Sequence, residues 1–219
     1  MTSIFCFSGS GHSLAIADYF SSMLSVPVNT ICRDTIPHGD TAIVVFPVYC
    51  QNIPAPVKAF LKKLNAANIV LIASYGRISY GRVLFEAQKL VRGNVIAGVY
   101  VPTGHTFLQG NTDFDEAAFL PVFERIKAPR TVSIPKTPKS LYANIFPGWR
   151  SRASVKITKS SCVNCGICRE CCPANDTTGC IRCLRCVSSC PHNALTFTVS
   201  PFLKKYLTTH YCDDLVLYL

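Results

Sequence analysis

Residues 162–191 read CVNCGICRECCPANDTTGCIRCLRCVSSCP, and this stretch holds nine of the chain's 13 cysteines. Eight of the nine fall into two copies of one spacing, C-x2-C-x2-C-x3-C-P. The first copy contains Cys162, Cys165, Cys168 and Cys172, and the second contains Cys180, Cys183, Cys186 and Cys190. A double match of this length rarely arises by chance. The stretch therefore predicts a metal-binding region around which this part of the chain is organised.

The spacing is typical of proteins that bind two 4Fe–4S clusters. Three thiolates on a short loop can wrap three irons of one cubane, so the fourth iron needs a ligand from elsewhere. The proline after the fourth cysteine turns the chain away, and that cysteine is expected to bind the other cluster. One cluster is thus predicted to use Cys162, Cys165, Cys168 and Cys190, and the other Cys180, Cys183, Cys186 and Cys172.

Two other uses of the cysteines are less well matched. A tetrahedral zinc site needs two C-x2-C pairs rather than two longer runs, and a disulfide framework needs an oxidising compartment. The N-terminal sequence MTSIFCFSGSG lacks the basic region and cleavage site of a signal peptide. We therefore expect a cytoplasmic location. Cys171 makes the register ambiguous, but the spacing favours Cys172 as the ligand and Cys171 as a small buried side chain.

Composition and charge narrow the class of protein. Of the 219 residues, 49% are hydrophobic, which is enough for a sizeable core. No apolar run approaches about 18 residues, so no membrane insertion is expected. The net charge is +10, and residues 121–160 carry nine Lys or Arg against Glu124. Such a basic region could bind nucleic acid, but anionic clusters would cancel part of the excess positive charge. We expect the remaining positive charge to favour an acidic redox protein partner.

The N-terminal segment predicts a site for an anion. Residues 3–7 read as a buried strand, residues 8–13 as a Gly/Ser loop, and a helix follows with Leu14, Ala17, Phe20 and Leu24 at the core spacing. Small residues let the backbone approach a phosphate, and the helix N-terminus supplies unpaired N–H groups. The loop has neither the Walker nor the G-x-G-x-x-G pattern. The alternative, less favoured than an anion site, is a plain strand-to-helix turn.

The next part of the chain alternates between strand and helix patterns. Strands are expected at 27–32, 41–46, 69–74 and 95–101, and helices at 54–64, 80–91 and 114–127. This order predicts an α/β fold with a doubly wound, five-stranded parallel sheet. Ligands bind such sheets at the carboxyl ends of the strands, where the loops 8–13, 47–53, 75–80 and 102–112 lie. Tyr49 and Tyr75 are the favoured rings for stacking on a flat aromatic cofactor.

Three short motifs at these strand ends resemble those of flavodoxins: FSGSGHS at 7–13, FPVY at 46–49 and SYG at 74–76. With the cysteine motifs, they make the chain similar to bacterial proteins that fuse a flavodoxin-like domain to a two-cluster 4Fe–4S ferredoxin. The resemblance implies FMN as a further cofactor. It also implies an FMN site made of Ser8, Gly9, Ser10, Gly11, His12, Ser13, Pro47, Tyr49, Asn52, Tyr75 and Gly76.

The chain departs from the family pattern at two of these loops. His12 stands where the family usually has Asn, and Ser10 keeps the hydroxyl of the usual Thr. Cys50, Gln51 and Asn52 replace glycines that are common after the tyrosine. Backbone flipping beside a flavin would then require Asn52 to accept a positive φ.

The sequence suggests four parts. They are a flavodoxin-like domain at 1–128, a proline-rich linker at 129–153, a ferredoxin domain at 154–200 and a C-terminal tail at 201–219. Trp149 in the linker is expected at the domain interface. Strands at 155–158 and 194–199 are expected to pair and close the ferredoxin domain. The function of the tail cannot be read from its sequence, although residues 200–207 suit a helix that docks on the first domain.

These features predict an electron-transfer protein that relays electrons between two 4Fe–4S clusters and an FMN-type flavin. The alternative is a flavin-dependent reductase of a small-molecule acceptor with a built-in ferredoxin donor. His105 would then line the substrate site. A third hypothesis is a structural or nucleic-acid-binding protein that uses clusters to staple a small domain. No catalytic residue is assigned, and the carrier is favoured over the enzyme.

Overall fold

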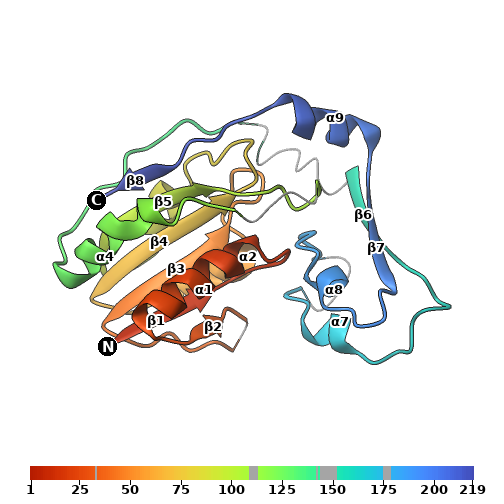
Figure 1. The fold of residues 1–219 in the computed structure, drawn as a ribbon, viewed down its shortest axis with the longest axis horizontal. Helices are drawn as coiled ribbons and strands as arrows, with labels where there is room; N and C mark the ends of the chain where they lie inside the picture. The colour runs from red at the N-terminus through yellow and green to blue at the C-terminus, as the bar shows by residue number, and fades with distance from the viewer. Residues whose placement is uncertain (33, 109–112, 142, 144–151, 175–178) are drawn as a thin grey trace.

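The computed structural model describes residues 1–32, 34–108, 113–141, 143, 152–174 and 179–219. In these residues the chain forms a six-stranded sheet covered by helices and a separate two-stranded sheet next to the cysteine segment (Figure 1). The fold is mixed α/β with a mostly parallel central sheet.

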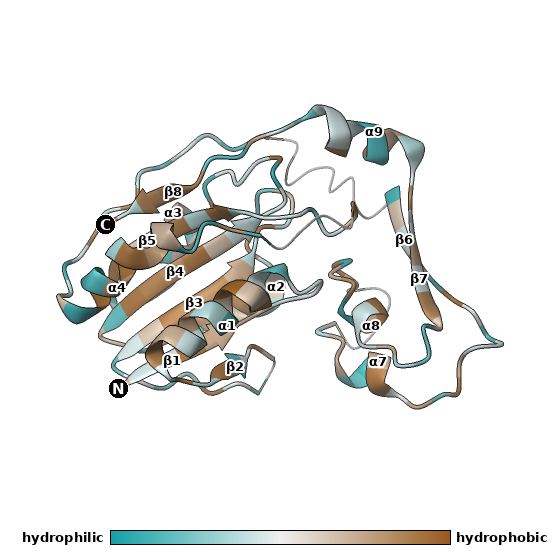
Figure 2. Cartoon of the chain, in the orientation of Figure 1, coloured by the Kyte–Doolittle hydropathy of each residue, from teal (hydrophilic) through white to brown (hydrophobic). Residues whose placement is uncertain are grey.

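Five parallel strands make up most of the central sheet, in the order β2-β1-β3-β4-β5. Their inner positions are almost entirely buried, except in the short strand β2, and Figure 2 shows that the strands are predominantly hydrophobic. Each strand overlaps a segment for which the sequence predicts a strand. Their bounds are β1 Thr2–Cys6, β2 Val28–Thr30, β3 Thr41–Pro47, β4 Asn68–Tyr75 and β5 Asn94–Pro102.

Helices cover both faces of this sheet. On one face, α2 (Ala55–Lys63) and α3 (Val83–Gln88) join a core cluster with Phe5, Val44 and Leu71. On the other face, α1 (His12–Leu24), the 3-10 turn η1 (Ala117–Phe119) and α4 (Leu120–Lys127) join a second cluster. A parallel sheet that is apolar on both faces requires this double cover.

The helices differ from the sequence prediction in face and length. Leu14 is 40% exposed, and the buried face of α1 is made of His12, Ser13, Ile16, Ala17 and Phe20. The reason is that Gly11, with a φ of 96°, starts the helix at His12, so that its first two side chains turn inward. Helix α3 begins later than predicted, because Gly81 takes a φ of 58° just before it.

The C-terminal tail returns to the central sheet. After α9 (Pro201–Thr209), β8 (Val216–Tyr218) pairs antiparallel with β5. The side chain of Arg77 donates from Nε to Asp213 Oδ1 over 2.6 Å, and the Tyr75 hydroxyl donates to the carbonyl of Asp214 over 2.8 Å. The prediction of a five-stranded sheet is therefore wrong by one strand, since the tail adds an antiparallel sixth.

The cysteine segment is flanked by a two-stranded antiparallel sheet, as the sequence predicts. Its strands are β6 (Ala153–Ile157) and β7 (Leu195–Val199). Two short helices, α7 (Ile167–Glu170) and α8 (Arg185–Ser188), lie between them in the chain. The predicted domain boundaries stay predictions, and Trp149 lies outside the described residues.

The segment before the cysteines runs beside β5. The amide of Val132 donates to the carbonyl of Val95 over 2.8 Å, and Ile134 is buried. A Cβ on Gly98 would lie 2.7 Å from Cδ1 of Ile134, so a larger residue there would displace the tip of the Ile134 side chain. In the described parts of the chain, no helix has the length and apolar character needed to cross a membrane.

The tail contact yields a first prediction. Replacing Tyr75 with Phe removes the hydroxyl that the Asp214 carbonyl accepts from, and we expect a loss of about 1 kcal/mol in the free energy of unfolding. Urea unfolding measures this loss, and hydrogen exchange should become faster at the β8 amides. Tyr211→Phe is the matched control, because Tyr211 bonds Asp213 on the exposed surface. Equal effects of the two variants would contradict the prediction.

Candidate functional site

One cavity brings together cysteines from both copies of the motif. Cys162, Cys165, Cys168 and Cys190 line a cavity of about 170 Å³. The loop that carries the first three is bent by positive φ values at Asn164 (55°) and at Gly166 (85°), the residue before α7. Cys190 comes from the end of the second copy, after α8. These four are the set that the crossed assignment names.

A second, smaller cavity holds the remaining four predicted ligands. Cys172, Cys180, Cys183 and Cys186 line a cavity of about 20 Å³. The second loop repeats the backbone conformation of the first, with positive φ at Arg182 (57°) and Leu184 (60°). These positions correspond to Asn164 and Gly166 in the first copy. The left-handed conformation costs a leucine about 1–2 kcal/mol. The second loop therefore keeps the backbone geometry of the first although Leu184 itself disfavours it.

The thiols of the second cavity influence one another. Burial raises the pKa of Cys186 to about 11, and the neighbouring thiols of Cys183, Cys171, Cys172 and Cys180 contribute to the rise. Burial also raises the pKa of Cys183. Ionising several such thiols together is unfavourable unless a cation compensates their charge, which is what metal ions do for coordinating thiolates. The donor set therefore fits a metal cluster.

Cys171 lies apart from both cavities. Its Sγ contacts the carbonyl of Cys168 at 3.6 Å, and burial raises its pKa. Within the described residues, no three His, Cys, Asp or Glu side chains converge on a single metal-ion position. A cubane spreads four cysteines over four irons, so its ligand set does not need such convergence. Which cysteines bind iron stays a prediction.

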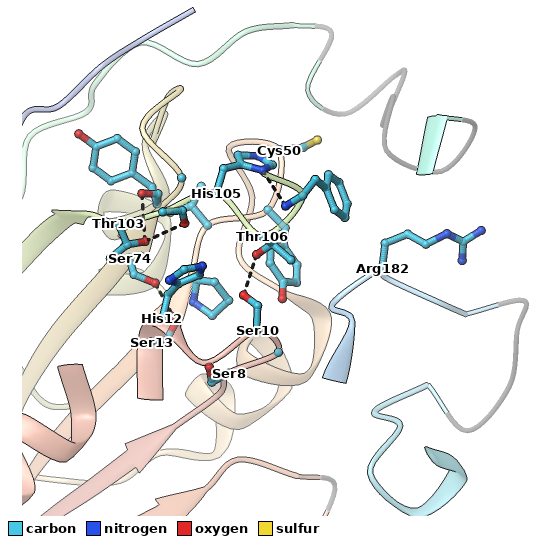
Figure 3. Close-up of a pocket in the computed structure, with 18 of the residues that line it drawn as sticks. Ser8, Ser10, His12, Ser13, Cys50, Ser74, Thr103, His105, Thr106 and Arg182 are labelled. Carbon is cyan, nitrogen blue, oxygen red and sulfur yellow. Dashed lines mark hydrogen bonds between the residues drawn. The ribbon is translucent and has the colours of Figure 1, made fainter. Parts of the chain in front are cut away.

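A third cavity, of about 100 Å³, lies at the carboxyl ends of the central strands (Figure 3). Hydroxyl groups and two imidazoles are among its lining groups. Nine of the eleven residues predicted for a flavin site line it: Ser8, Gly9, Ser10, His12, Ser13, Pro47, Tyr49, Tyr75 and Gly76. Gly11 and Asn52 do not. Sequence reasoning missed Thr103 and Thr106 on this cavity, although it had placed their loop at this edge.

The 8–13 loop is held by hydroxyl contacts. Ser10 Oγ lies 2.9 Å from Thr106 Oγ1, and Ser13 Oγ lies 2.7 Å from Ser74 Oγ in a buried position. The amide of Gly11 donates to Ser8 Oγ over 3.2 Å. Helix α1 starts at this loop without a hydrogen bond from a capping side chain. Its N-terminal N–H groups are therefore suited to an anion.

Two histidines meet at this cavity. His12 is 8% exposed, and its Nδ1 is a buried nitrogen without a hydrogen-bond partner among the described residues. Burial lowers the pKa of His12, and burial together with the nearby His12 lowers the pKa of His105 to about 4. The Phe107 amide donates to Nδ1 of His105 over 3.1 Å, so the neutral ring carries its proton on Nε2.

The Nδ1 atom of His12, which has no hydrogen-bond partner among the described residues, indicates whether the cavity suits a phosphate. Buried polar atoms are nearly always hydrogen-bonded, because an unmade bond is costly. A phosphate group at the helix N-terminus would offer a partner to this ring and to the hydroxyls around it. The residues present therefore fit a small anion.

Two predicted flavin contacts need correction. The Tyr75 residue is 2% exposed, and its hydroxyl bonds Asp214, so its ring has no free face for stacking. The Asn52 amide donates from Nδ2 to the carbonyl of Ala143 over 3.1 Å and accepts from Lys139 Nζ over 2.7 Å. The Tyr75 hydroxyl and the Asn52 side-chain amide are therefore both hydrogen-bonded to other parts of the chain.

Asn52 does not take a positive φ in this structure, whereas Cys50 (48°) and Gln51 (58°) do. Tyr49 and Asn52 exchange two backbone hydrogen bonds of 3.0 and 2.9 Å, which close a two-residue turn. Such a turn needs positive φ at both central residues. The pairing of the flanking residues therefore fixes which positions take the unusual conformation.

The second cysteine copy contacts the 8–13 loop directly. Arg185 Nε donates to the carbonyl of Ser8 over 2.8 Å, and Ser188 Oγ donates to the carbonyl of Gly9 over 3.0 Å. A Cβ on Gly9 would collide with the carbonyl oxygen of Cys183. Sequence reasoning missed Arg185 and Ser188. The signal that could have indicated this contact is Gly9, since a loop glycine often marks a close backbone approach.

Comparison with known proteins identifies the second copy. The sequence model of the 4Fe-4S binding domain family matches residues 176–196. No curated protein and no solved structure matches the chain. The chain therefore carries a 4Fe–4S binding domain with further cysteines next to it, which indicates iron–sulfur electron transfer.

The contact at Gly9 yields the second prediction. Gly9→Ala places a methyl group against the Cys183 carbonyl, and we expect a loss of about 1–3 kcal/mol in the free energy of unfolding, as for other overpacked sites. Hydrogen exchange should become faster at the α8 amides. The control is Gly11→Ala, where the new Cβ meets nothing within 4 Å but the φ of 96° is strained. Unchanged exchange in α8 of Gly9→Ala would contradict the contact.

Proposed function

We propose that this chain is an electron-transfer protein that relays single electrons between two 4Fe–4S clusters and an FMN-type flavin. The observation that carries the proposal is the contact between the second cysteine copy and the 8–13 loop. Cys183 is 7% exposed, its carbonyl packs against Gly9, and Arg185 bonds Ser8. A cluster on this copy would adjoin the cavity at the sheet edge, which is the arrangement that a relay requires.

Two clusters are favoured over one because the motif copies repeat in both sequence and backbone. Positive φ recurs at corresponding positions of the two loops, and each cavity receives a cysteine from the opposite copy. The family match covers the second copy. The first copy is assigned to a second cluster on this internal likeness.

The flavin part of the proposal is supported by topology and by the anion site. The parallel strand order 2-1-3-4-5 is that of flavodoxin-like sheets, whose FMN binds at the carboxyl ends of the strands. Ser8, Ser10 and His12 would hold the phosphate at the start of α1. Bound FMN would exchange one or two electrons, whereas each cluster exchanges one.

The ring of the flavin needs more room than the phosphate. Ligand pockets usually have volumes of about 300–1,000 Å³, and this cavity has about 100 Å³. Tyr49 and Phe107 lie on its rim. We propose that the turn at 49–52 and the loop at 104–108 separate when the ring enters. Tyr49 is then the aromatic contact, in place of Tyr75.

A reductase of a small acceptor is the second candidate. His105 favours it, because this residue lines the cavity and its neutral ring presents an N–H group at Nε2. A bound acceptor could take a hydrogen bond from that group. Steady-state turnover of an added acceptor separates this candidate from a carrier that exchanges electrons with protein partners.

Cofactor analysis tests the proposal. The protein is purified without oxygen and analysed for iron, sulfide and released flavin. From the ligand count we expect about eight irons, about eight sulfides and one FMN per chain. His12→Leu should lower FMN retention more than riboflavin retention, because only FMN carries the phosphate. A protein that contains zinc and no iron would overturn the whole proposal, and one that contains iron but binds no flavin would overturn the flavin part.

The crossed ligand set gives the fourth prediction. Cys172→Ser should lower the iron content towards about four atoms per chain, because the second cluster loses a ligand. Cys171→Ser is the matched control, since Cys171 lies next to it but outside both cavities, and it should keep the full content. Iron analysis and the absorbance near 400 nm measure both. If Cys171→Ser loses iron and Cys172→Ser keeps it, the register is wrong.

A further inference from the structure

The two cysteine cavities differ in their exposure to solvent. In the first, Cys165 is exposed. Three apolar side chains on the same cavity are also exposed: Ile157 at 60%, Val163 at 59% and Ile167 at 37%. In the second, Cys183 and Leu184 are 7% and 5% exposed. The first cavity therefore faces outward, and the second faces the central sheet.

Two basic side chains lie at the outward cavity. Lys159 and Arg169 are exposed, and Arg169 lines the cavity itself. Lys156 is on the opposite face of β6 from Ile157, so it is not part of this surface. Glu170 is the only acidic residue between 152 and 174 in the sequence. None of the salt bridges between described residues involves Lys159 or Arg169. Their charges are thus available to a partner. We call the surface formed by Ile157, Lys159, Val163, Ile167 and Arg169 the outer rim.

We propose that the outer rim is the docking surface for an acidic one-electron carrier protein, and this inference rests on the proposed electron-transfer function. An apolar centre with a charged periphery is the usual anatomy of a protein–protein interface. Complementary charge speeds the encounter of such partners. Nucleic acid, the other polyanion, would gain its affinity from phosphate contacts and has no use for three exposed aliphatic side chains around a cysteine.

The inference assigns an order to the relay. One electron leaves the reduced carrier and arrives at the cluster site of Cys162, Cys165, Cys168 and Cys190, without a bond change or a proton transfer. The inner site, which is the cavity of Cys172, Cys180, Cys183 and Cys186 next to Gly9, then exchanges electrons with the cavity at the sheet edge. The same order applies in reverse when the carrier is the acceptor.

Charge reversal tests the docking surface. The test variant combines Lys159→Glu and Arg169→Glu. The control combines Lys89→Glu and Arg92→Glu, which gives the same net charge at the opposite, amino end of the sheet, where β5 begins. A reduced plant-type 2Fe–2S ferredoxin serves as the acidic carrier and cytochrome c as a basic one. Stopped-flow rates and calorimetric Kd values are measured at several salt concentrations, and iron is determined in each protein.

We expect the outer-rim variant to react with the ferredoxin at least about tenfold more slowly at low salt, with a correspondingly weaker Kd. The difference should vanish near 1 M salt, where screening is nearly complete. Its reaction with cytochrome c should become faster. The amino-end control should resemble the unaltered protein. Ile157→Ser should weaken the Kd several-fold while the salt dependence stays the same, because it removes apolar contact and no charge.

Other outcomes overturn the inference in distinguishable ways. If both charge-reversal variants slow equally, net charge alone steers the carrier and the outer rim is no docking site. If the protein ignores the ferredoxin but binds duplex DNA through these residues, the surface belongs to nucleic acid. If the unaltered protein contains no iron, the proposed function fails first. Iron-loaded protein whose rates are insensitive to the outer rim refutes the docking surface alone.

Discussion

The rest of the structure depends on a backbone contact between two loops that are far apart in the sequence. The carbonyl groups of Ser8 and Gly9 accept hydrogen bonds from Arg185 and Ser188, and glycine at position 9 lets Cys183 approach. The guanidinium of Arg185 also lies 4.7 Å from the centroid of the Phe7 ring. One arginine thus joins the end of the first strand, the 8–13 loop and the cysteine motif. Because these bonds use main-chain carbonyls, they engage none of the loop's N–H groups or hydroxyls.

Charge explains why these parts belong together. Thiolates held in a small volume repel one another, and burial penalises each of them, as the raised pKa of Cys186 shows. Iron relieves this cost, so the cysteine segment is expected to gain stability when it binds metal. The clusters and the phosphate that we propose would all be anionic, and the chain's net charge of +10 would oppose them. A basic protein is therefore suited to hold several anionic cofactors close together.

Much of this architecture could be read from local sequence. Apolar runs at 41–46, 69–74 and 95–101 are typical of strands with both faces covered, and the cysteine spacing located the metal-binding region. What could not be read depends on contacts distant in the chain. Tyr75 was correctly placed at a strand end, but its ring direction is set by Asp214, 139 residues away. Likewise, nothing in the sequence VLY shows that it pairs with β5 rather than remaining free.

The backbone at 50–51 illustrates a second limit. Cysteine and glutamine have no preference for positive φ, so side-chain identity does not predict this conformation at positions 50 and 51. The turn is imposed by the mutual hydrogen bonds of Tyr49 and Asn52. Likewise, the resemblance to flavodoxins placed His12 at the cofactor loop, but only the packing of the first helical turn makes it a buried ring. Propensity predicts which residues can adopt a conformation, while pairing and packing decide which ones do.

The return of the C-terminal strand has a topological consequence. The segment before the cysteines runs along β5 through Val132, and the segment after them ends as β8 on the same strand. The iron–sulfur unit is therefore an insertion, anchored at both ends to one edge of the sheet, rather than an appendage on a single hinge. Double anchoring confines this unit to a small volume and keeps its effective concentration at the 8–13 loop high even when the direct contacts open. The electron exchange that we propose between the two parts would then be independent of dilution, as in a permanent complex.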